Sequence, residues 1–302
     1  MKKIFFAAVI CFLLCSPGAS ADEPPWKAMK PFCLPEYSIG GEVYKPGVAA
    51  IKIEYRYTKK DELYQGSSHI GHSGAGPASI KQQLFFLGFR YGLIDRVDFR
   101  IQLPLLFMDI KDSAGTSLAN PNGIGDLALL VRYQILNPTN GVPFFMSLGL
   151  GFGAPTGSTD ANGAGTGAWD FYSELTFSYI WTRQRIDAEF FYGLRGSGEH
   201  DGVDTSRGNF AKGMFFYGFA ISHCFDVGLD GIVQWVGRDS VNHIDLENSG
   251  GTTVYLGPVV HLKWLRHKTF LSFSIPFSIY RDVNGSQLTS DWFFNFFFKC
   301  KF

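Results

Sequence analysis

Two groups of residues have the types and spacing that chemistry requires, and the first combines histidine with serine. His69 and His72 precede Ser73 in a segment rich in Gly and Ser, and such side chains can activate a hydroxyl nucleophile or contribute to a metal site. The His-x-Ser-Asn order of a lipid hydrolase is absent from this segment, so we interpret the two histidines as incidental loop residues. We therefore predict no catalytic residues, no metal ligands, no cofactor and no enzymatic activity.

The second group consists of Gly149, Gly151 and Gly153, which alternate with larger residues. A glycine-rich turn binds phosphate where a helix follows it, and no helical pattern follows Gly153. The three glycines share one face of an extended segment. We expect the missing side chains to leave space inside the fold or to let another segment approach.

A larger set of charged side chains recurs at alternate positions within apolar segments, which places them on one face of an extended chain. Acidic and basic residues are similarly frequent on this face, so we expect pairing across neighbouring strands. In a closed barrel this face would line the lumen. The candidate lumen-lining residues are Lys52, Glu54, Arg56, Arg90, Asp98, Arg100, Asp126, Arg132, Asp170, Glu174, Asp187, Glu189, Arg195, Lys212, Asp230, Arg238, His261 and Lys263.

The elements that would carry these residues are about ten residues long and alternate apolar with polar positions, as membrane-spanning strands do. Beyond the first residues, no apolar run approaches the about 18 residues of a membrane helix, whereas a closed barrel leaves no backbone group unpaired in lipid. The sequence predicts an all-β fold, a transmembrane antiparallel up-and-down β-barrel of about 12 strands and of the outer-membrane type. The expected strands are 48–58, 79–92, 96–109, 124–136, 142–155, 168–182, 184–196, 209–222, 225–238, 252–264, 268–281 and 290–302.

The connections between these segments alternate in length, as in bacterial barrels with short periplasmic turns and long outer loops. An even number of strands would place both termini in the periplasm. Prolines fall within four predicted strands and imply bulges or early strand ends, because a closed barrel has no free edge for them. These are Pro104, Pro143, Pro258 and Pro276. The long connections are expected at 59–78, 110–123, 156–167, 197–208, 239–251 and 282–289.

The N-terminal region and the overall charge narrow the class of protein. Lys+Arg and Asp+Glu are both 27, so the chain lacks the basic excess that favours nucleic acid. A basic start, an apolar run and small residues predict a signal peptide at 1–21. The proline-rich segment 22–47 would lie in the periplasm or plug the lumen, and 48–302 would form the barrel. Cys33, Cys224 and Cys300 would remain after cleavage, and both a Cys33–Cys224 disulfide and three free thiols are open.

A Gly-Asp-Leu strand with a basic-Tyr ending is followed by a glycine-rich strand that closes in Pro-Thr-Gly. This pattern resembles the outer-membrane transporters associated with the meta-pathway of phenol degradation, and the resemblance is best over residues 122–195. It implies a barrel associated with aromatic or hydrophobic solutes and brings no catalytic residues with it. The residues that match are Asp126, Arg132, Pro155, Thr156 and Gly157.

These features together predict a channel in the bacterial outer membrane for passive uptake of a small hydrophobic or aromatic solute. Inward-facing rings, among them Phe86, Phe191 and Phe216, would add apolar surface to the charged lining. The alternative is a general or ion-selective porin, and a lipid-modifying enzyme or a structural barrel has weaker support. We expect a monomer whose partners are the solute, membrane lipids, lipopolysaccharide and, through the strand that ends in Phe302, the barrel-assembly machinery.

Overall fold

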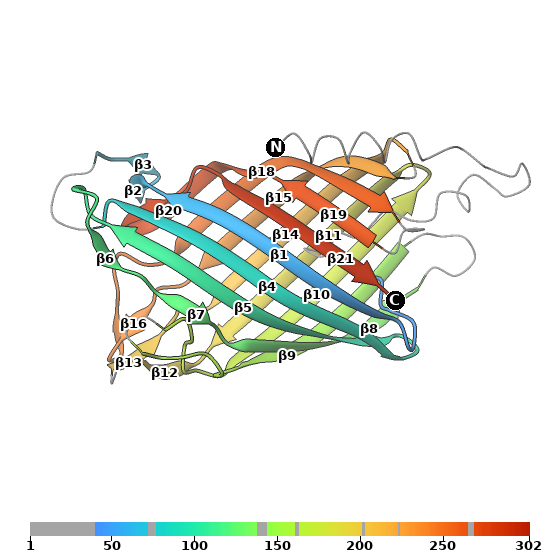
Figure 1. Ribbon diagram of the computed structural model, residues 1–302, viewed down its shortest axis with the longest axis horizontal. Helices are drawn as coiled ribbons and strands as arrows, with labels where there is room; N and C mark the ends of the chain where they lie inside the picture. Colours follow the sequence, from blue (N-terminus) through green and yellow to red (C-terminus); the bar gives the residue numbers. More distant parts are fainter. Residues whose placement is uncertain are drawn as a thin grey trace, which may run out of the picture.

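The computed structural model describes residues 40–71, 77–137, 144–160, 163–200, 203–222, 224–264 and 269–302. Strand β1 (Ala49–Lys60) pairs with β4 (Ser79–Ile94) along one edge and with β21 (Phe293–Lys301) along the other, which closes the sheet. The predicted antiparallel barrel of 12 strands is confirmed (Figure 1). Closure gives the strand backbone hydrogen-bond partners without water, as a membrane requires.

Each remaining strand of the barrel wall pairs with the next one along the chain, in the up-and-down order that the sequence predicts. One wall strand is divided into β19 and β20. These strands are β5 (Val97–Lys111), β8 (Leu127–Leu136), β9 (Phe144–Ala154), β10 (Asp170–Trp181), β11 (Gln184–Arg195), β14 (Phe210–Ala220), β15 (Phe225–Val236), β18 (Gly251–Trp264), β19 (Thr269–Ser274) and β20 (Phe277–Thr289).

The two faces of the wall differ because successive side chains of a strand point to opposite sides. On β11 the apolar side chains of Phe190 and Leu194 are 59% and 49% exposed, whereas Asp187 and Glu189 are 0% and 4% exposed. The exposed apolar face is the one that would contact lipid. The buried polar face surrounds the lumen, which is the space that the wall encloses.

The two ends of the barrel differ in their connections. The turn end holds the start of β1 and the C-terminal residue Phe302, and the loop end lies at the left of Figure 1. At the loop end, short strands extend the wall, and four of them form a separate sheet. The short strands are β2 (Glu62–Gly66), β3 (Ser68–His69), β6 (Ser117–Ala119), β7 (Asn122–Ile124), β12 (Ser197–His200), β13 (Val203–Ser206), β16 (Ser240–Val241) and β17 (Ile244–Asp245).

The prediction of a loop at 282–289 is wrong, because β20 continues to Thr289. Its last residues pair with β2, and Leu288 lies opposite Leu63. The segment Asp282–Thr289 has the polar, glycine-containing composition of a turn, so its local sequence favours a loop. The distant partner strand β2 overrides this preference by satisfying the backbone of β20.

The prolines within the wall lie where strand pairing is interrupted, as predicted. Pro104 falls between the part of β5 that pairs with β8 and the part that pairs with β7. Pro258 falls where the partner of β18 changes from β20 to β19, and Pro276 separates β19 from β20. A proline has no amide hydrogen to donate to the neighbouring strand. An interruption of strand pairing at a proline therefore loses fewer backbone hydrogen bonds than an interruption at another residue. Pro143 lies outside the described residues.

Several sequence predictions concern the first part of the chain. The signal peptide at 1–21 and most of the segment 22–47 lie outside the described residues, as does Cys33. Cys224 is disulfide-bonded, and Cys300 has a free thiol. Within the described part of the chain, no helix combines the length and the apolar character needed to cross a membrane.

Candidate functional site

A charge cluster lies inside the turn end of the lumen, where β4, β5 and β8 are neighbours. Asp98 accepts hydrogen bonds from Arg90 Nε at 2.7 Å and from Arg132 Nε at 3.0 Å. A second guanidinium nitrogen of Arg132 lies 3.1 Å from the other Asp98 oxygen. Asp98 and Arg132 are 0% exposed, and Arg90 is 3% exposed. Two arginines therefore share one carboxylate that has no contact with solvent.

The chain that precedes β1 lies against this cluster. The backbone amide of Tyr44 donates to Asp98 Oδ2 at 2.9 Å. Arg132 donates to the carbonyl oxygen of Gly40 at 3.1 Å and to that of Glu42 at 2.9 Å. The charged side chains of the wall thus bind the backbone of residues 40–44, which have no strand partner of their own.

The same segment also contacts the next part of the wall. The amide of Gly41 donates to Ser178 Oγ on β10 at 3.0 Å, and its carbonyl accepts from Gln134 Nε2 on β8 at 2.9 Å. The carboxylate of Glu42 lies 4.0 Å from Arg185 on β11. Residues 40–44 therefore contact side chains from β4 to β11 and occupy part of the lumen at the turn end.

Charges of opposite sign also meet further along the lumen. Glu174 on β10 is 2% exposed and lies 3.0 Å from Arg100 and 3.5 Å from Arg132. On β1, Lys52 Nζ lies 2.9 Å from Glu54. Arg100 and Arg132 come from different strands, β5 and β8, so Glu174 connects three strands of the wall. The predicted pairing of lumen charges across strands is therefore seen between Glu174 and the two arginines, whereas Lys52 and Glu54 lie on one strand.

Two more ion pairs lie on the wall strands β11, β15 and β18. Arg185 Nε donates to Asp187 Oδ2 at 2.5 Å, and Lys263 Nζ donates to Asp226 Oδ1 at 2.7 Å. Arg185, Asp187 and Asp226 are 0% exposed, and Lys263 is 4% exposed. Side chains that line an open water-filled pore would be exposed, so these four charged groups do not line such a pore.

Aromatic rings gather at the loop end of the lumen. The rings of Phe191 and Phe210 stack with centroids 5.7 Å apart, and Tyr172 lies 5.5 Å from Phe191. Gly193 leaves room for this group, because a Cβ there would lie 2.1 Å from the Phe210 ring. A Cβ on Gly153 would lie 2.6 Å from the Tyr172 hydroxyl. The expectation that the alternating glycines leave space for neighbouring groups is confirmed at Gly153.

The charged residues assigned to the lumen from the sequence differ in their exposure. Arg56, Arg100, Asp126, Arg195 and Lys212 are partly exposed, and Arg238 is exposed beyond the end of β15. The members that are less than a tenth exposed are Lys52, Glu54, Arg90, Asp98, Arg132, Asp170, Glu174, Asp187, Glu189, Asp230, His261 and Lys263.

Arg281 is a buried charged residue that the sequence does not predict for the lumen. It is 7% exposed and donates to Thr289 Oγ1 and Asp291 Oδ1, both at 2.7 Å. Its position in the alternation predicts the outer face. A β-bulge changes this, because Val254 lies opposite Tyr280 whereas the next residue of β18 lies opposite Ser278. The extra residue reverses the side to which the following side chains point. No local sequence signal marks this bulge.

The histidines considered for chemistry do not form a site together. His69 Nε2 lies 2.7 Å from the carboxylate of Glu62 at the exposed loop end, while His72 and Ser73 lie outside the described residues. His261 is buried, with a phenylalanine ring centroid 5.3 Å from its own. Within the ranges that the structure describes, no three His, Cys, Asp or Glu residues are grouped to hold a metal ion.

Comparisons with known proteins agree with this architecture. Residues 75–289, more than half of the chain, match the family described as "Putative MetA-pathway of phenol degradation". No curated protein matches the chain at a significant level. An outer membrane channel from Pseudomonas putida F1 superposes with a TM-score of 0.70 at 14% identity, covering 86% of this chain and 97% of that one.

Two other solved barrels are less similar. The toluene transporter TodX of P. putida has a TM-score of 0.42 at 7% identity, and the transport unit of the autotransporter AIDA-I from Escherichia coli has 0.47 at 8%. Each comparison covers 85% of this chain and 91% of the other. The first similarity, at a TM-score of 0.70, shows the fold of an outer-membrane barrel.

Proposed function

The chain belongs to this phenol-degradation family, and from that premise we propose that it is an outer-membrane channel for passive uptake of a small hydrophobic or aromatic solute. The fold has a lumen, and the family associates it with aromatic compounds. Passive passage needs no energy source and no catalytic group. The candidate lumen-lining residues then act by shaping and neutralising the route of the solute.

The observation that carries this proposal is the mutual neutralisation of the lumen charges. An ion-selective pore presents an excess of one sign to the permeating ion. Here basic side chains are bound to carboxylates along the inner face, while the rings of Tyr172, Phe191 and Phe210 remain partly exposed at the loop end. A lining of this kind favours an apolar or aromatic solute. The ion pairs of the inner face are Lys52–Glu54, Arg56–Glu54, Arg90–Asp98, Arg100–Glu174, Arg132–Asp98, Arg185–Asp187 and Lys263–Asp226.

Burial at the turn end argues against the alternative of a general diffusion porin. Side chains around an open pore remain in contact with water, whereas Asp98, Arg132 and Arg185 are 0% exposed. We propose that the segment 22–47, whose residues 40–44 contact these side chains, acts as a partial plug on the periplasmic side. A solute that enters at the loop end would then leave only when this segment moves.

The outer surface supports the proposed membrane partners. The C-terminal strand places Phe294, Phe296 and Phe298 on the face opposite the buried Asn295 and Phe297, and Phe302 is 60% exposed. Alternating aromatic residues that end in Phe are the signal we assign to the barrel-assembly machinery. Lipids and lipopolysaccharide would surround the apolar face, and we propose a monomer.

Single-channel conductance in a planar bilayer tests the plug and the pore together. The intact protein and a variant that lacks residues 22–47 are refolded, and unchanged heat-dependent gel mobility controls for folding of the barrel. Intact protein that is nearly silent, with conductance appearing on removal of the segment, supports a plugged channel. Steady large conductance of the intact protein would instead favour a general porin.

Uptake by cells tests the solute class. The lipopolysaccharide leaflet is the barrier for both phenol and a small sugar in a porin-deficient strain. Expression of a channel selective for aromatic solutes should therefore increase uptake of radiolabelled phenol and leave uptake of the sugar nearly unchanged. Equal stimulation of both would refute selectivity for aromatic solutes. No stimulation of either would refute the channel function.

A further inference from the structure

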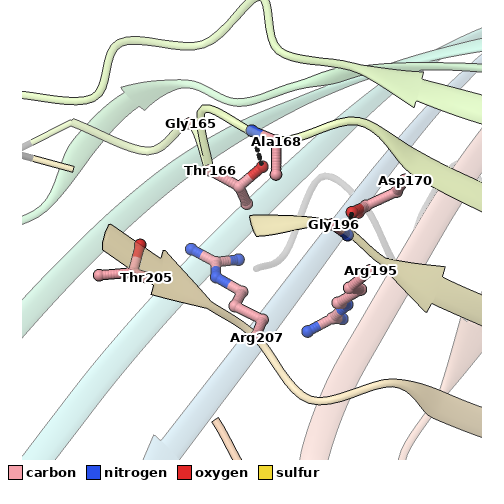
Figure 2. A pocket seen from close by; sticks show the side chains of 8 residues that line it. All are labelled: Gly165, Thr166, Ala168, Asp170, Arg195, Gly196, Thr205 and Arg207. Atoms are coloured by element: carbon pink, nitrogen blue, oxygen red, sulfur yellow. Dashed lines mark hydrogen bonds between the residues drawn. The ribbon is translucent and has the colours of Figure 1, made fainter. Parts of the chain in front are cut away.

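A pocket opens at the loop end of the barrel between two connections, the one from β9 to β10 and the one from β11 to β14 (Figure 2). Its empty space, including part of the open solvent, is about 310 Å³. Thr166 lines it from the connection before β10, Asp170 from the start of β10, Arg195 from the end of β11, and Arg207 from the segment after β13. The pocket is therefore built by two predicted outer loops, 156–167 and 197–208, together with the adjoining ends of the predicted strands 168–182 and 184–196.

The two arginines of this pocket differ from the other arginines of the lumen. Within the described part of the chain, neither Arg195 nor Arg207 has a carboxylate within 4.0 Å or a hydrogen-bond acceptor for its guanidinium. By contrast, Arg90, Arg132 and Arg185 each bind a carboxylate. A guanidinium carries five N–H donors in a planar arrangement that fits a carboxylate. The donors of Arg195 and Arg207 are thus available to a ligand.

The acidic residue of the pocket already has partners. Asp170 accepts hydrogen bonds from the Gly196 amide at 3.3 Å and from the Tyr172 hydroxyl at 3.1 Å. Thr166 is held through its own hydroxyl, which donates to Asp126 at 2.6 Å. Two arginines and one carboxylate leave an excess of one positive charge among the residues that line the pocket.

An aromatic surface adjoins these arginines on the lumen side. The guanidinium of Arg195 lies 4.6 Å from the centroid of the Phe210 ring, over its face. Phe210 stacks on Phe191, and Tyr172 links this pair to Asp170 of the pocket. All three rings are partly exposed. A planar ring can add to such a stack, while the edge of the Arg195 guanidinium remains open to an acid group.

We propose that this pocket is a binding site at the outer mouth for an aromatic carboxylate. The carboxylate would bind the guanidinium groups of Arg195 and Arg207, and the ring would lie against Phe191 and Phe210. The inference rests on the proposed uptake function, and it names both the solute class and the first contact on the route into the lumen. The arginines recognise the carboxylate by its charge, and the aromatic side chains recognise the ring by stacking. A ligand therefore needs both a carboxylate and a ring.

Isothermal titration of the full-length protein in detergent tests the site without transport. The probes are benzoate, benzamide, acetate and inorganic phosphate. The test variant is Arg195→Gln combined with Arg207→Gln. The control is Arg183→Gln, which removes an exposed arginine in the turn between β10 and β11 that does not line the pocket.

We expect saturable benzoate binding that the double variant weakens by about tenfold or more, since a charge-assisted pair is lost. The control should bind benzoate unchanged, and benzamide and acetate should bind more weakly than benzoate. A second variant, Phe191→Leu, should weaken benzoate about threefold to tenfold through lost stacking and leave acetate unchanged.

Three results would overturn the site. They are benzoate binding that survives the double variant, benzamide binding equal to that of benzoate, and displacement of benzoate by phosphate or acetate at equal concentration, which would indicate a general anion site. If any of these occurs while cells still take up phenol, the proposed function stands and only the site is refuted. Absent phenol uptake refutes the proposed function itself.

Discussion

Asp98 is the residue whose substitution tests the lumen network most directly. Its carboxylate accepts from Arg90 Nε at 2.7 Å, from Arg132 Nε at 3.0 Å and from the Tyr44 amide at 2.9 Å. Replacing Asp98 with Asn keeps the shape of the side chain. It removes the charge, however, and turns one acceptor oxygen into a donor that faces other donors.

The structure sets the size of the expected effect. Asp98 is 0% exposed, and so is Arg132, so water cannot replace the lost charge. Leaving one partner of a buried ion pair uncompensated costs about 3–5 kcal/mol. We expect Asp98→Asn to lower the free energy of unfolding by this amount. Asp95→Asn should change it by less than about 0.5 kcal/mol, because the Asp95 side chain in the adjoining turn is 88% exposed.

Urea unfolding of the barrel in phospholipid vesicles, followed by tryptophan fluorescence, measures both changes. A double-mutant cycle adds Arg132→Met. The pair should cost less than the sum of the single changes, because the double variant leaves only Arg90 without its carboxylate, whereas Asp98→Asn alone leaves both arginines without it. Asp98→Asn should also increase the ion current through the protein in a planar bilayer, because the amide of Tyr44 loses a charged acceptor. A loss below about 1 kcal/mol for Asp98→Asn, or additive costs in the cycle, would refute the reasoning.

Three further predictions concern the wall, the aromatic group and the cysteines. Leu150→Arg should lower the free energy of unfolding in vesicles by about 2–4 kcal/mol, because Leu150 is 62% exposed on the outer face of β9; no loss would contradict a lipid-facing position. Gly193→Val should cost about 1–3 kcal/mol by displacing the Phe210 ring, whereas Gly213→Val, where a Cβ meets nothing within 4 Å, is the matched control; equal costs would contradict the close contact. Alkylation of the unfolded mature chain should label one thiol before reduction and three after it, and peptide mapping should show Cys33 linked to Cys224. Three labelled thiols before reduction would refute this pairing.

Much of the wall is predictable because its signal is local. Alternation of apolar and polar residues predicts a strand at 184–196, and β11 covers Gln184–Arg195. The polar segment Asp282–Thr289 carries no such signal, since its partner β2 lies more than 200 residues earlier. For a related reason the alternation predicts the wrong face for Arg281, because the bulge that turns it inward depends on pairing with β18.

The candidate site also has features that the local sequence predicts and features that depend on tertiary contacts. The sequence indicates which face of a strand carries charge, so it places Asp98 and Arg132 in the lumen without reference to their contacts. It contains no signal for Arg90 and Arg132 sharing Asp98. The unpaired state of Arg195 and Arg207 is likewise visible only once the loops are placed around the pocket.

The sequence by itself determined the class of fold, the apolar outer face, the alternating connection lengths and the residues available to the lumen. Each of these follows from the two-residue period of a strand, which is a local property of the chain. Only the tertiary structure decided which charges neutralise one another, where residues 40–44 lie and which arginines remain available to a solute. These depend on how strands far apart in sequence are aligned when the barrel closes, and that alignment is set by the whole ring of strands rather than by any one of them.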